Sequence, residues 1–555
     1  MALDYPVYRS IVYINGRKVH FRSCGSGPVV FLLHGSPQSS WAVLPLAQQL
    51  AKQGLCAIAP DSPGYGVSHP FYNASVTPPT TVDYAEALVE LANYLDIQEF
   101  GLYGFHTGAA IACTAAALYP ERVTALTSDG LTAWTDAERN TLLQGYLPPF
   151  KPQWDGSHMA WVWARIEEQV AFFPWHIAED RCRINVDMSP PSRIHANAMD
   201  VLRAGDGYRI AYHAAFTFRA ESWLPQVKCP TLFACLTHDP LSAHYQRKVF
   251  SHHRTKLFDA PDDMYRVFAE VLGSSPGSLY RARAHTGEDN FGLSHGWVGK
   301  PGQSLAWSGT LKHADDRATL VLLHSAGGNK EDFVNLLRIL CKHRNVIAFD
   351  LPGHGDSEDL TDPPTDVATI GQMIAEHLSR LGIDAVAAIG RGVGGLVAAW
   401  MVTHQHANNG IAFGLPDVPE QYKAQWADRY CTDLTPVWEG THLIRAFRIA
   451  RWERIYAPWF DRTAVARKLC CGLLDADSVH QRAVSILKAG NAWRAAVAAE
   501  TTLTHSDLPM DERRFKYFAV KGDAQSMTQV LQQTPIYVGQ IGADDSEWYP
   551  LVCAV

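Results

Sequence analysis

The segment from Phe100 to Pro120, FGLYGFHTGAAIACTAAALYP, combines a reactive residue with a pattern that would present it. It predicts a short apolar strand, a turn bracketed by Gly104 and Gly108, and an alanine-rich helix. His106 stands at the centre of that turn. Because an imidazole gains and loses a proton near neutral pH, a histidine held there is a candidate general base. It would activate water or take a proton from a substrate.

The elements around this turn predict a parallel sheet with helices on both faces. A β-hairpin is expected over 8–24, with Asn15-Gly16 as its turn. Besides the short strand that begins the segment 100–120, strands are expected at 28–33, 56–59, 123–128 and 230–236, with helices between them. Strands that alternate with helices are typical of doubly wound α/β folds, whose sites lie at the carboxyl ends of the strands. The mostly helical section 131–225 would form a cap over those ends.

The second half of the chain repeats this plan. The run VAAIGRGVGGLVAA at 386–399 matches the His106 turn, and Trp438-Glu-Gly-Thr-His442 matches Trp154-Asp-Gly-Ser-His158. Many matches at a near-constant offset indicate two fused homologous lobes. We predict lobe one at 1–275, a Gly/Ser/Pro-rich linker region at 276–302, and lobe two at 303–555 with its cap near 411–510.

Each half resembles a member of the α/β-hydrolase superfamily that carries a helical cap. The segment His34-Gly35-Ser36-Pro37 is similar to the opening loop of the epoxide hydrolase and haloalkane dehalogenase branch. The turn at His106 corresponds to the nucleophile elbow, which holds serine in most of the superfamily and aspartate in that branch. The resemblance implies the fold, two α/β-hydrolase-fold lobes with doubly wound, mostly parallel sheets, but the elbow residue differs. The expected reaction therefore does not follow from the family.

The resemblance also implies where the other site residues fall. Asp239 follows a late strand at the usual acid position, and Asp262 and Asp263 lie in the last loop, where the family has its histidine. We expect a histidine–carboxylate dyad between His106 and Asp262 or Asp263. The sequence does not show whether Asp129 takes the place of Asp239. The backbone N–H groups of Ser36 and Thr107 would form the oxyanion hole.

Lobe two lacks a side chain at the equivalent position, because its elbow centres on Gly392. Asp523 corresponds to Asp239, and Asp544 and Asp545 stand where a histidine would be needed. We predict that lobe two is not catalytic and that neither lobe runs serine–histidine–aspartate chemistry.

The predicted cap of lobe one is rich in aromatic residues. Trp154, Trp161 and His158 are candidate substrate contacts, and such a cap favours a small hydrophobic or aromatic substrate. His158 recurs as His442 in lobe two, which favours a role in folding the cap. A metal centre built from His106, His158, His238 and an aspartate is a third interpretation, but no regular ligand spacing supports it. We expect no metal and no cofactor.

Bulk composition excludes several other classes. The chain has 48 basic and 56 acidic residues and no long basic run, which argues against a nucleic-acid partner. Its 11 cysteines, an odd number in a long chain, suit a reducing compartment. No leader-like or membrane-length apolar segment is expected, so we predict a cytoplasmic protein without a membrane partner. Lobe–lobe packing is expected, and the oligomeric state stays open.

Two functions follow from the sequence. The first is a cofactor-free hydrolase or lyase that uses His106 as a base on a small apolar carbonyl compound such as an ester, a lactone or a C–C bond. The alternative is a non-catalytic ligand-binding or scaffold protein with the same fold.

Overall fold

The computed structural model describes residues 4–552 except 75, 276, 314–316, 417, 419, 469–474, 504–506, 521–534 and 542–547. The chain divides into two compact units. The first unit contains residues 1–151 and 161–287, and the second contains 152–160 and 288–555. Among the described residues, no helix is both long enough and apolar enough to cross a membrane.

The first unit opens with the predicted hairpin. β1 (Val7–Ile14) pairs antiparallel with β2 (Arg17–Leu33), with Ile14 opposite Arg17. Asn15 and Gly16 connect them at φ values of 53° and 76°. Positive φ at both central residues gives the turn a twist that matches the two strands, and Asn-Gly tolerates it well. The hairpin prediction is confirmed.

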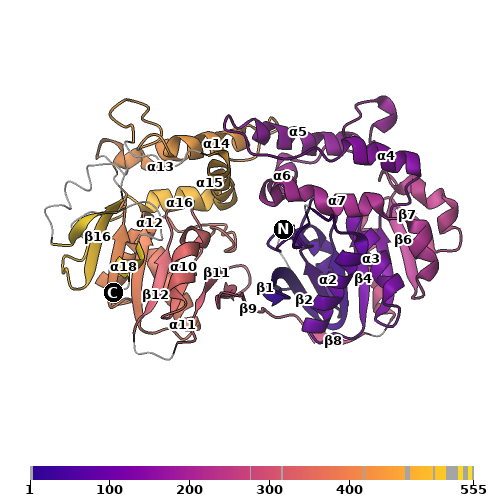
Figure 1. Ribbon diagram of the computed structural model, residues 1–555, viewed down its shortest axis with the longest axis horizontal. Helices are drawn as coiled ribbons and strands as arrows, with labels where there is room; N and C mark the ends of the chain where they lie inside the picture. Colours follow the sequence, from indigo (N-terminus) through magenta and orange to yellow (C-terminus); the bar gives the residue numbers. More distant parts are fainter. Residues whose placement is uncertain are drawn as a thin grey trace. The chain divides into compact units, whose positions relative to one another are not determined.

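A mixed sheet of eight strands forms the centre of the first unit (Figure 1). Its main path runs β1-β2-β4-β5-β6-β7, with β3 and β8 also paired to β2, and the strands from β4 to β7 are parallel to their neighbours. The apolar runs of β3 and β4 are buried because helices cover the sheet. The bounds are β3 (Cys56–Pro60), β4 (Phe100–Phe105), β5 (Val123–Asp129), β6 (Thr231–Leu236), β7 (Thr255–Phe258), β8 (Leu279–Arg281), α1 (Leu44–Lys52), α2 (Thr81–Tyr94), α3 (Thr107–Leu118) and α9 (Pro261–Gly273).

The cap lies between β5 and β6, as the helical section of the sequence predicts. Figure 1 shows its helices grouped over one end of the first sheet. Helix α7 packs against α2 and α3, so the cap adjoins the helix that follows His106. The cap helices are α4 (Asp136–Gly145), α5 (Ser157–Ala171), α6 (Pro191–Ala204), α7 (Tyr208–Thr217) and α8 (Ala220–Trp223).

The second unit is also built on a mostly parallel sheet, here with nine strands in the order β17-β16-β15-β14-β12-β13-β11-β10-β9. β14 (Val386–Arg391), Gly392 and α12 (Val393–Thr403) form its elbow. Its remaining elements are β9 (Gly287–Glu288), β10 (Ser294–Val298), β11 (Leu305–Thr310), β12 (Thr319–Leu323), β13 (Val346–Phe349), β15 (Asn409–Phe413), β16 (Phe515–Val520), β17 (Tyr537–Ile541), α10 (Val334–Leu340), α11 (Val367–Arg380), α13 (Trp426–Tyr430), α14 (Thr441–Glu453), α15 (Ala476–Ala489), α16 (Asn491–Ala499) and α18 (Tyr549–Val552).

The region predicted as a linker, 276–302, contains paired strands. β8 pairs with β2 of the first unit, and β10 pairs with β11 of the second. The division between the units falls after Gly287, inside this region. Its Gly and Ser residues mark the turns between short edge strands rather than one continuous loop.

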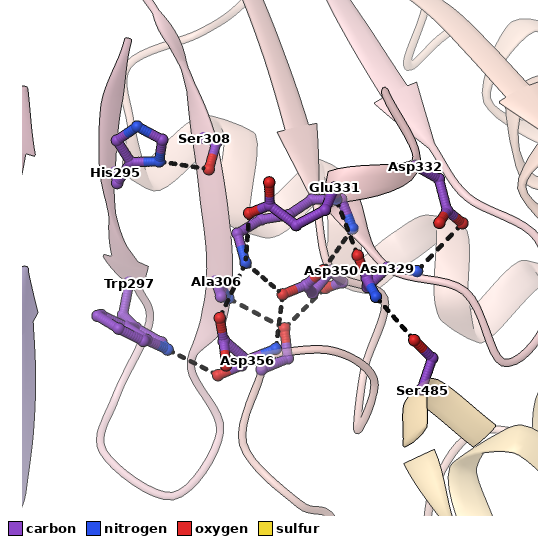
Figure 2. Close-up of polar contacts among 12 residues, drawn as sticks. His295, Trp297, Ala306, Ser308, Asn329, Glu331, Asp332, Asp350, Asp356 and Ser485 are labelled. Carbon is purple, nitrogen blue, oxygen red and sulfur yellow. Dashed lines mark hydrogen bonds and ion pairs between the residues drawn. The ribbon is translucent and has the colours of Figure 1, made fainter. Parts of the chain in front are cut away.

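A buried aspartate organises the loop after the second central strand in each unit. Asp61 accepts hydrogen bonds from the backbone N–H groups of Ser40 and Val67, both at 2.8 Å. In the second unit, Asp350 accepts from the N–H groups of Lys330 and Asp356, both at 2.6 Å. Figure 2 shows Asp350 beside Asp356. These bonds fix the loops around each elbow, because a buried carboxylate is retained only when its oxygens are bonded.

The counter-group of this aspartate differs between the units. His20 Nδ1 lies 2.7 Å from Asp61 Oδ2, whereas Lys330 Nζ lies 2.8 Å from Asp350 Oδ2. Burial lowers the pKa of His20 to about 4 in spite of Asp61, so at neutral pH His20 is an uncharged donor. Burial opposes ionisation of Asp61, yet His20 and Arg22 hold the pKa of this carboxyl well below its usual range.

Candidate functional site

His106 occupies a strained turn between β4 and α3. Its backbone has φ 48° and ψ −105°, a conformation that residues with a Cβ rarely adopt. Close packing on both sides enforces the turn. A Cβ on Gly108 would lie 2.2 Å from the Leu33 carbonyl oxygen, and one on Gly130 would lie 2.3 Å from His106 Cδ2. The glycines therefore let the strand, the helix and the imidazole approach one another.

The carboxylate in contact with His106 is Asp239. His106 Nε2 lies 2.8 Å from Asp239 Oδ2. Asp239 follows β6 and accepts a hydrogen bond from the Leu241 N–H on its other oxygen, Oδ1, at 2.8 Å. The aspartate is thus fixed by its own loop, and it fixes the orientation of the imidazole.

The second ring nitrogen of His106 is the reactive one in this arrangement. An ionised Asp239 accepts the Nε2 proton, which leaves the Nδ1 lone pair as the base. Within the part of the chain that the structure describes, no protein group is hydrogen-bonded to Nδ1. The imidazole is 34% exposed, whereas Asp239 is 13% exposed. The ring of Phe105 stacks on the imidazole with centroids 4.0 Å apart. A substrate or a water molecule can therefore reach the ring, and the carboxylate lies behind it.

Two carboxylates set the charge of the imidazole. Burial by itself would lower the pKa of His106, but Asp239, with a smaller contribution from Asp129, raises it above the ordinary value. Burial opposes ionisation of Asp239, and His106 outweighs it, so the pKa of Asp239 is lowered. Asp129 ends β5, and burial raises its pKa to about 7. Its Oδ2 accepts a hydrogen bond from the Tyr103 hydroxyl at 3.3 Å. Asp129 therefore lies beside the dyad without replacing Asp239.

The expected partners of His106, Asp262 and Asp263, lie elsewhere, which corrects that expectation. Both are exposed in the first turn of α9, where Asp263 forms an ion pair with Arg266 at 3.2 Å. The physical reason is the proline at 261, which begins a helix shortly after β7 and leaves a short connection. Carboxylates in a first helical turn are favoured by the helix dipole, which accounts for the pair without a role in the site.

The two predicted oxyanion donors lie at the places the sequence indicates. Ser36 follows the end of β2, and its hydroxyl lies 3.1 Å from the Tyr65 hydroxyl. Thr107 is the first residue of α3, so its N–H is one of those that a helix leaves without an internal partner. The role of both N–H groups stays a prediction. His34 is structural, since its ring contacts the Gly35 carbonyl and accepts from the Ser62 N–H, both at 2.9 Å.

The predicted cap contacts are divided between the units. Trp154 and His158 belong to the segment 152–160, which groups with the second unit. There His158 Nε2 lies 3.2 Å from His480 Nδ1, and the guanidinium of Arg451 lies over the Trp154 ring. Trp161 belongs to the first unit, where its ring lies 6.1 Å from that of Phe150. Trp154 and His158 thus have packing contacts within the second unit, and their role in substrate binding stays a prediction.

The elbow of the second unit has the same backbone shape without a side chain. Gly392 has φ 55° and ψ −128°, close to the values at His106. Arg482 donates to the Ala326 carbonyl in the loop after β12 and to Glu453. Asp523, Asp544 and Asp545, which the sequence places near this elbow, lie outside the described residues.

Among the residues that the structure describes, no group of three or more His, Cys, Asp or Glu side chains is arranged to hold a metal ion. This includes His106, His158 and His238, which the third interpretation of the sequence combined.

The fold and the elbow place this chain in a known class. The family described as alpha/beta hydrolase fold matches residues 28–263 and 318–437, and the chain belongs to that family. The two matched segments lie one in each half of the sequence.

Epoxide hydrolases are among the relatives of this chain. Epoxide hydrolase 3 of Siraitia grosvenorii is 38% identical over 112 residues, which cover 20% of this chain and 35% of the relative. An epoxide hydrolase of Caballeronia sordidicola is 37% identical over 114 residues, covering 20% and 33%. The chain therefore spans about a third of the length of these relatives. The crystal structure of epoxide hydrolase A from Mycobacterium thermoresistibile matches 49% of this chain and 100% of that protein, with a TM-score of 0.41 and 16% identity.

Proposed function

We propose that the first unit is a hydrolase or lyase in which His106 acts as a general base on a carbonyl compound such as an ester, a lactone or a β-diketone. The observation that carries the proposal is the 2.8 Å contact between His106 Nε2 and Asp239 Oδ2, together with an exposed imidazole edge. A carboxylate that holds one ring nitrogen and leaves the other open is the arrangement a base requires.

In the proposed reaction, Nδ1 of His106 takes a proton from water as the water oxygen attacks the carbonyl carbon. Asp239 stabilises the imidazolium that forms. The N–H groups of Ser36 and Thr107 would hold the negative charge on the carbonyl oxygen. When the intermediate collapses, the imidazolium returns the proton to the leaving group, so the enzyme ends unchanged. For a β-diketone the same attack leads to cleavage of a C–C bond.

The epoxide hydrolase branch that this chain resembles has an aspartate at the elbow, whereas this chain has His106. The reaction of that branch is therefore not transferred to this chain. An elbow histidine cannot form the ester that an elbow aspartate would form with an epoxide. An epoxide nevertheless belongs in the substrate panel, because His106 could activate water against it directly.

The second unit is proposed to be a non-catalytic copy that arose by tandem duplication. Its elbow carries glycine in place of a reactive side chain. The side chain of Arg482 is hydrogen-bonded to the Ala326 carbonyl in the loop that follows β12. The rival function for the whole chain is a binding protein without turnover.

The experiment compares wild type with His106→Gly on esters, lactones, β-diketones and epoxides, before and after treatment with a chelator. Glycine suits the elbow, since Gly392 has the same backbone shape, so the variant should fold. Asp263→Asn is the control at an exposed carboxylate. We expect turnover that survives chelation, is unchanged in the control and falls by about 10²–10⁴-fold in His106→Gly.

The other outcomes decide against the base. Turnover that disappears on chelation would favour a metal-dependent reaction. No turnover, combined with a ligand-induced rise in Tm that His106→Gly leaves intact, would favour the binding protein.

A further inference from the structure

A buried arginine in the cap of the first unit forms no ion pair with a carboxylate in the described part of the chain. Arg165 on α5 is 1% exposed. Four aromatic rings surround its guanidinium, those of Tyr146, Trp175, Tyr208 and Tyr212, at 5.2–5.8 Å from Cζ to the ring centroids. We call these four rings and Arg165 the arginine cage. A guanidinium stays protonated even when buried, so the cage encloses a permanent positive charge.

The unpaired donors of Arg165 lie along one edge of the guanidinium. Nη1 donates to Gln169 Oε1 at 2.7 Å. Nε and Nη2 are buried and make no well-formed hydrogen bond within the described chain, although the hydroxyls of Tyr208 and Tyr212 interact with the guanidinium. These two nitrogens form the edge that binds both oxygens of a carboxylate in parallel. A buried charge with two open donors is unfavourable unless a ligand completes it.

The second unit contains an arginine whose edge is paired with a carboxylate of the chain itself. Arg482 donates from Nε to Glu453 Oε2 at 2.8 Å and from Nη2 to Glu453 Oε1 at 3.1 Å. Glu453 follows His442 by the same number of residues as Gln169 follows His158. The repeat therefore has a carboxylate in one unit and a neutral amide in the other. In the second unit a carboxylate covers the edge of an arginine, but Arg482 lies on α15 whereas Arg165 lies on α5, so the two arginines come from different elements of the repeat.

The arginine cage adjoins the loop that carries Ser36. The Tyr65 hydroxyl donates to the backbone carbonyl of Tyr208 at 2.6 Å and lies 3.1 Å from the Ser36 hydroxyl. Two hydrogen bonds thus connect a cage residue to one of the predicted oxyanion residues. A ligand group held at Arg165 would belong to a molecule that extends toward the elbow.

We propose that Arg165 binds a carboxylate group of the substrate, so that the substrate class is a carbonyl compound that also carries a carboxylate. This inference rests on the proposed function for the reacting end of the molecule, and it narrows the substrate from an apolar compound to an anionic one. The aromatic rings of the cage exclude water and strengthen the charge-assisted bonds.

The test measures binding, which does not depend on turnover. Phenylacetate is titrated against its neutral isostere phenylacetamide by calorimetry at pH 7.5. Wild type is expected to bind the carboxylate at least about tenfold more tightly, because two hydrogen bonds to a charged group are gained. His106→Gly should keep the preference for phenylacetate, because His106 is not part of the arginine cage. A result against the proposed base is therefore distinguishable from a result against the arginine site.

Variants of the cage make the test specific. Gln169→Glu gives the guanidinium a carboxylate of the chain itself at Nη1, where Gln169 Oε1 lies 2.7 Å away. Because this neutralises the buried charge, the variant should abolish the preference for phenylacetate while raising Tm. Arg165→Gln should abolish the preference, and Arg219→Gln, an exposed arginine of the cap, should leave it unchanged. If Arg165→Gln does not fold, Gln169→Glu still decides. No preference in wild type, or a preference that survives Gln169→Glu, would overturn the proposal.

Discussion

The dyad makes a prediction about the pKa of one imidazole. In Asp239→Asn the carboxylate 2.8 Å from His106 Nε2 is replaced by a neutral amide of the same shape. Burial, which lowers the pKa of His106, then acts with little opposition, since only the smaller contribution of Asp129 remains. The pKa of His106, which is raised in wild type, should therefore fall toward or below the ordinary value of a histidine.

The size of the shift follows from the bond that is removed. A hydrogen bond to a charged group contributes about 1.5–3 kcal/mol, and 1.36 kcal/mol corresponds to about one pKa unit. Because about a third of the imidazole is exposed, solvent screens the charge and the lower end applies. We expect a decrease of about one unit.

The assay is an NMR titration of the histidine ring protons, with the His106 signal assigned by its loss in His106→Gly. Asp263→Asn is the control and should leave the titration unchanged. Activity should rise with pH through the pKa of His106 in wild type, because only the neutral imidazole is a base. An unchanged or higher pKa in Asp239→Asn would refute the assignment of Asp239 as the partner.

The same dyad has a defined effect on stability. A pKa raised on folding gives stability that is fully present below the unfolded value and is lost as pH rises through the folded value. The Tm difference between wild type and Asp239→Asn should therefore be larger at pH 5.5 than at pH 8.5.

Three further predictions concern other parts of the chain. Asp61→Asn should lower the free energy of unfolding at pH 7 by about 3 kcal/mol in chemical denaturation. Because the pKa of Asp61 is held low in the folded protein, the difference between wild type and variant should shrink as the pH falls below about 4. A difference that does not change with pH would contradict this prediction. Glu453→Gln should remove the carboxylate partner of the partly buried Arg482 and cost about 1–3 kcal/mol by the same measurement, whereas a neutral effect would show that the pair is dispensable. A serine-directed phosphonate should label no residue at the elbow, which carries His106, and a labelled active-site serine in peptide mapping would disprove the base mechanism.

Local signals in the sequence were sufficient for the fold. Asn15-Gly16 identified the hairpin because few dipeptides tolerate positive φ at both positions. The glycines around His106 identified the elbow, because the turn admits no side chain at those positions. Both features depend on residues that are close together in the chain.

The partner of His106 could not be chosen from the sequence alone. Asp239 and the pair at 262–263 all follow late strands, and only the length of the connection after β7 separates them in space. The cap presented the same difficulty. Aromatic residues at helical spacing cannot be divided between core and ligand contacts, and Trp154 and His158 pack with the second unit. The open edge of Arg165 is likewise invisible in the sequence, because pairing of charges is a property of the folded chain.

The backbone at His106 also bears on how the two halves could diverge. A residue with a Cβ at this turn costs about 1–3 kcal/mol, whereas glycine adopts the turn without strain. A mutation from histidine to glycine would therefore relieve strain while it removed the imidazole. Under the proposed function, selection for chemistry would keep the histidine, and a copy released from that selection would accept glycine without backbone strain. Gly392, at φ 55°, is the residue that such drift would leave behind.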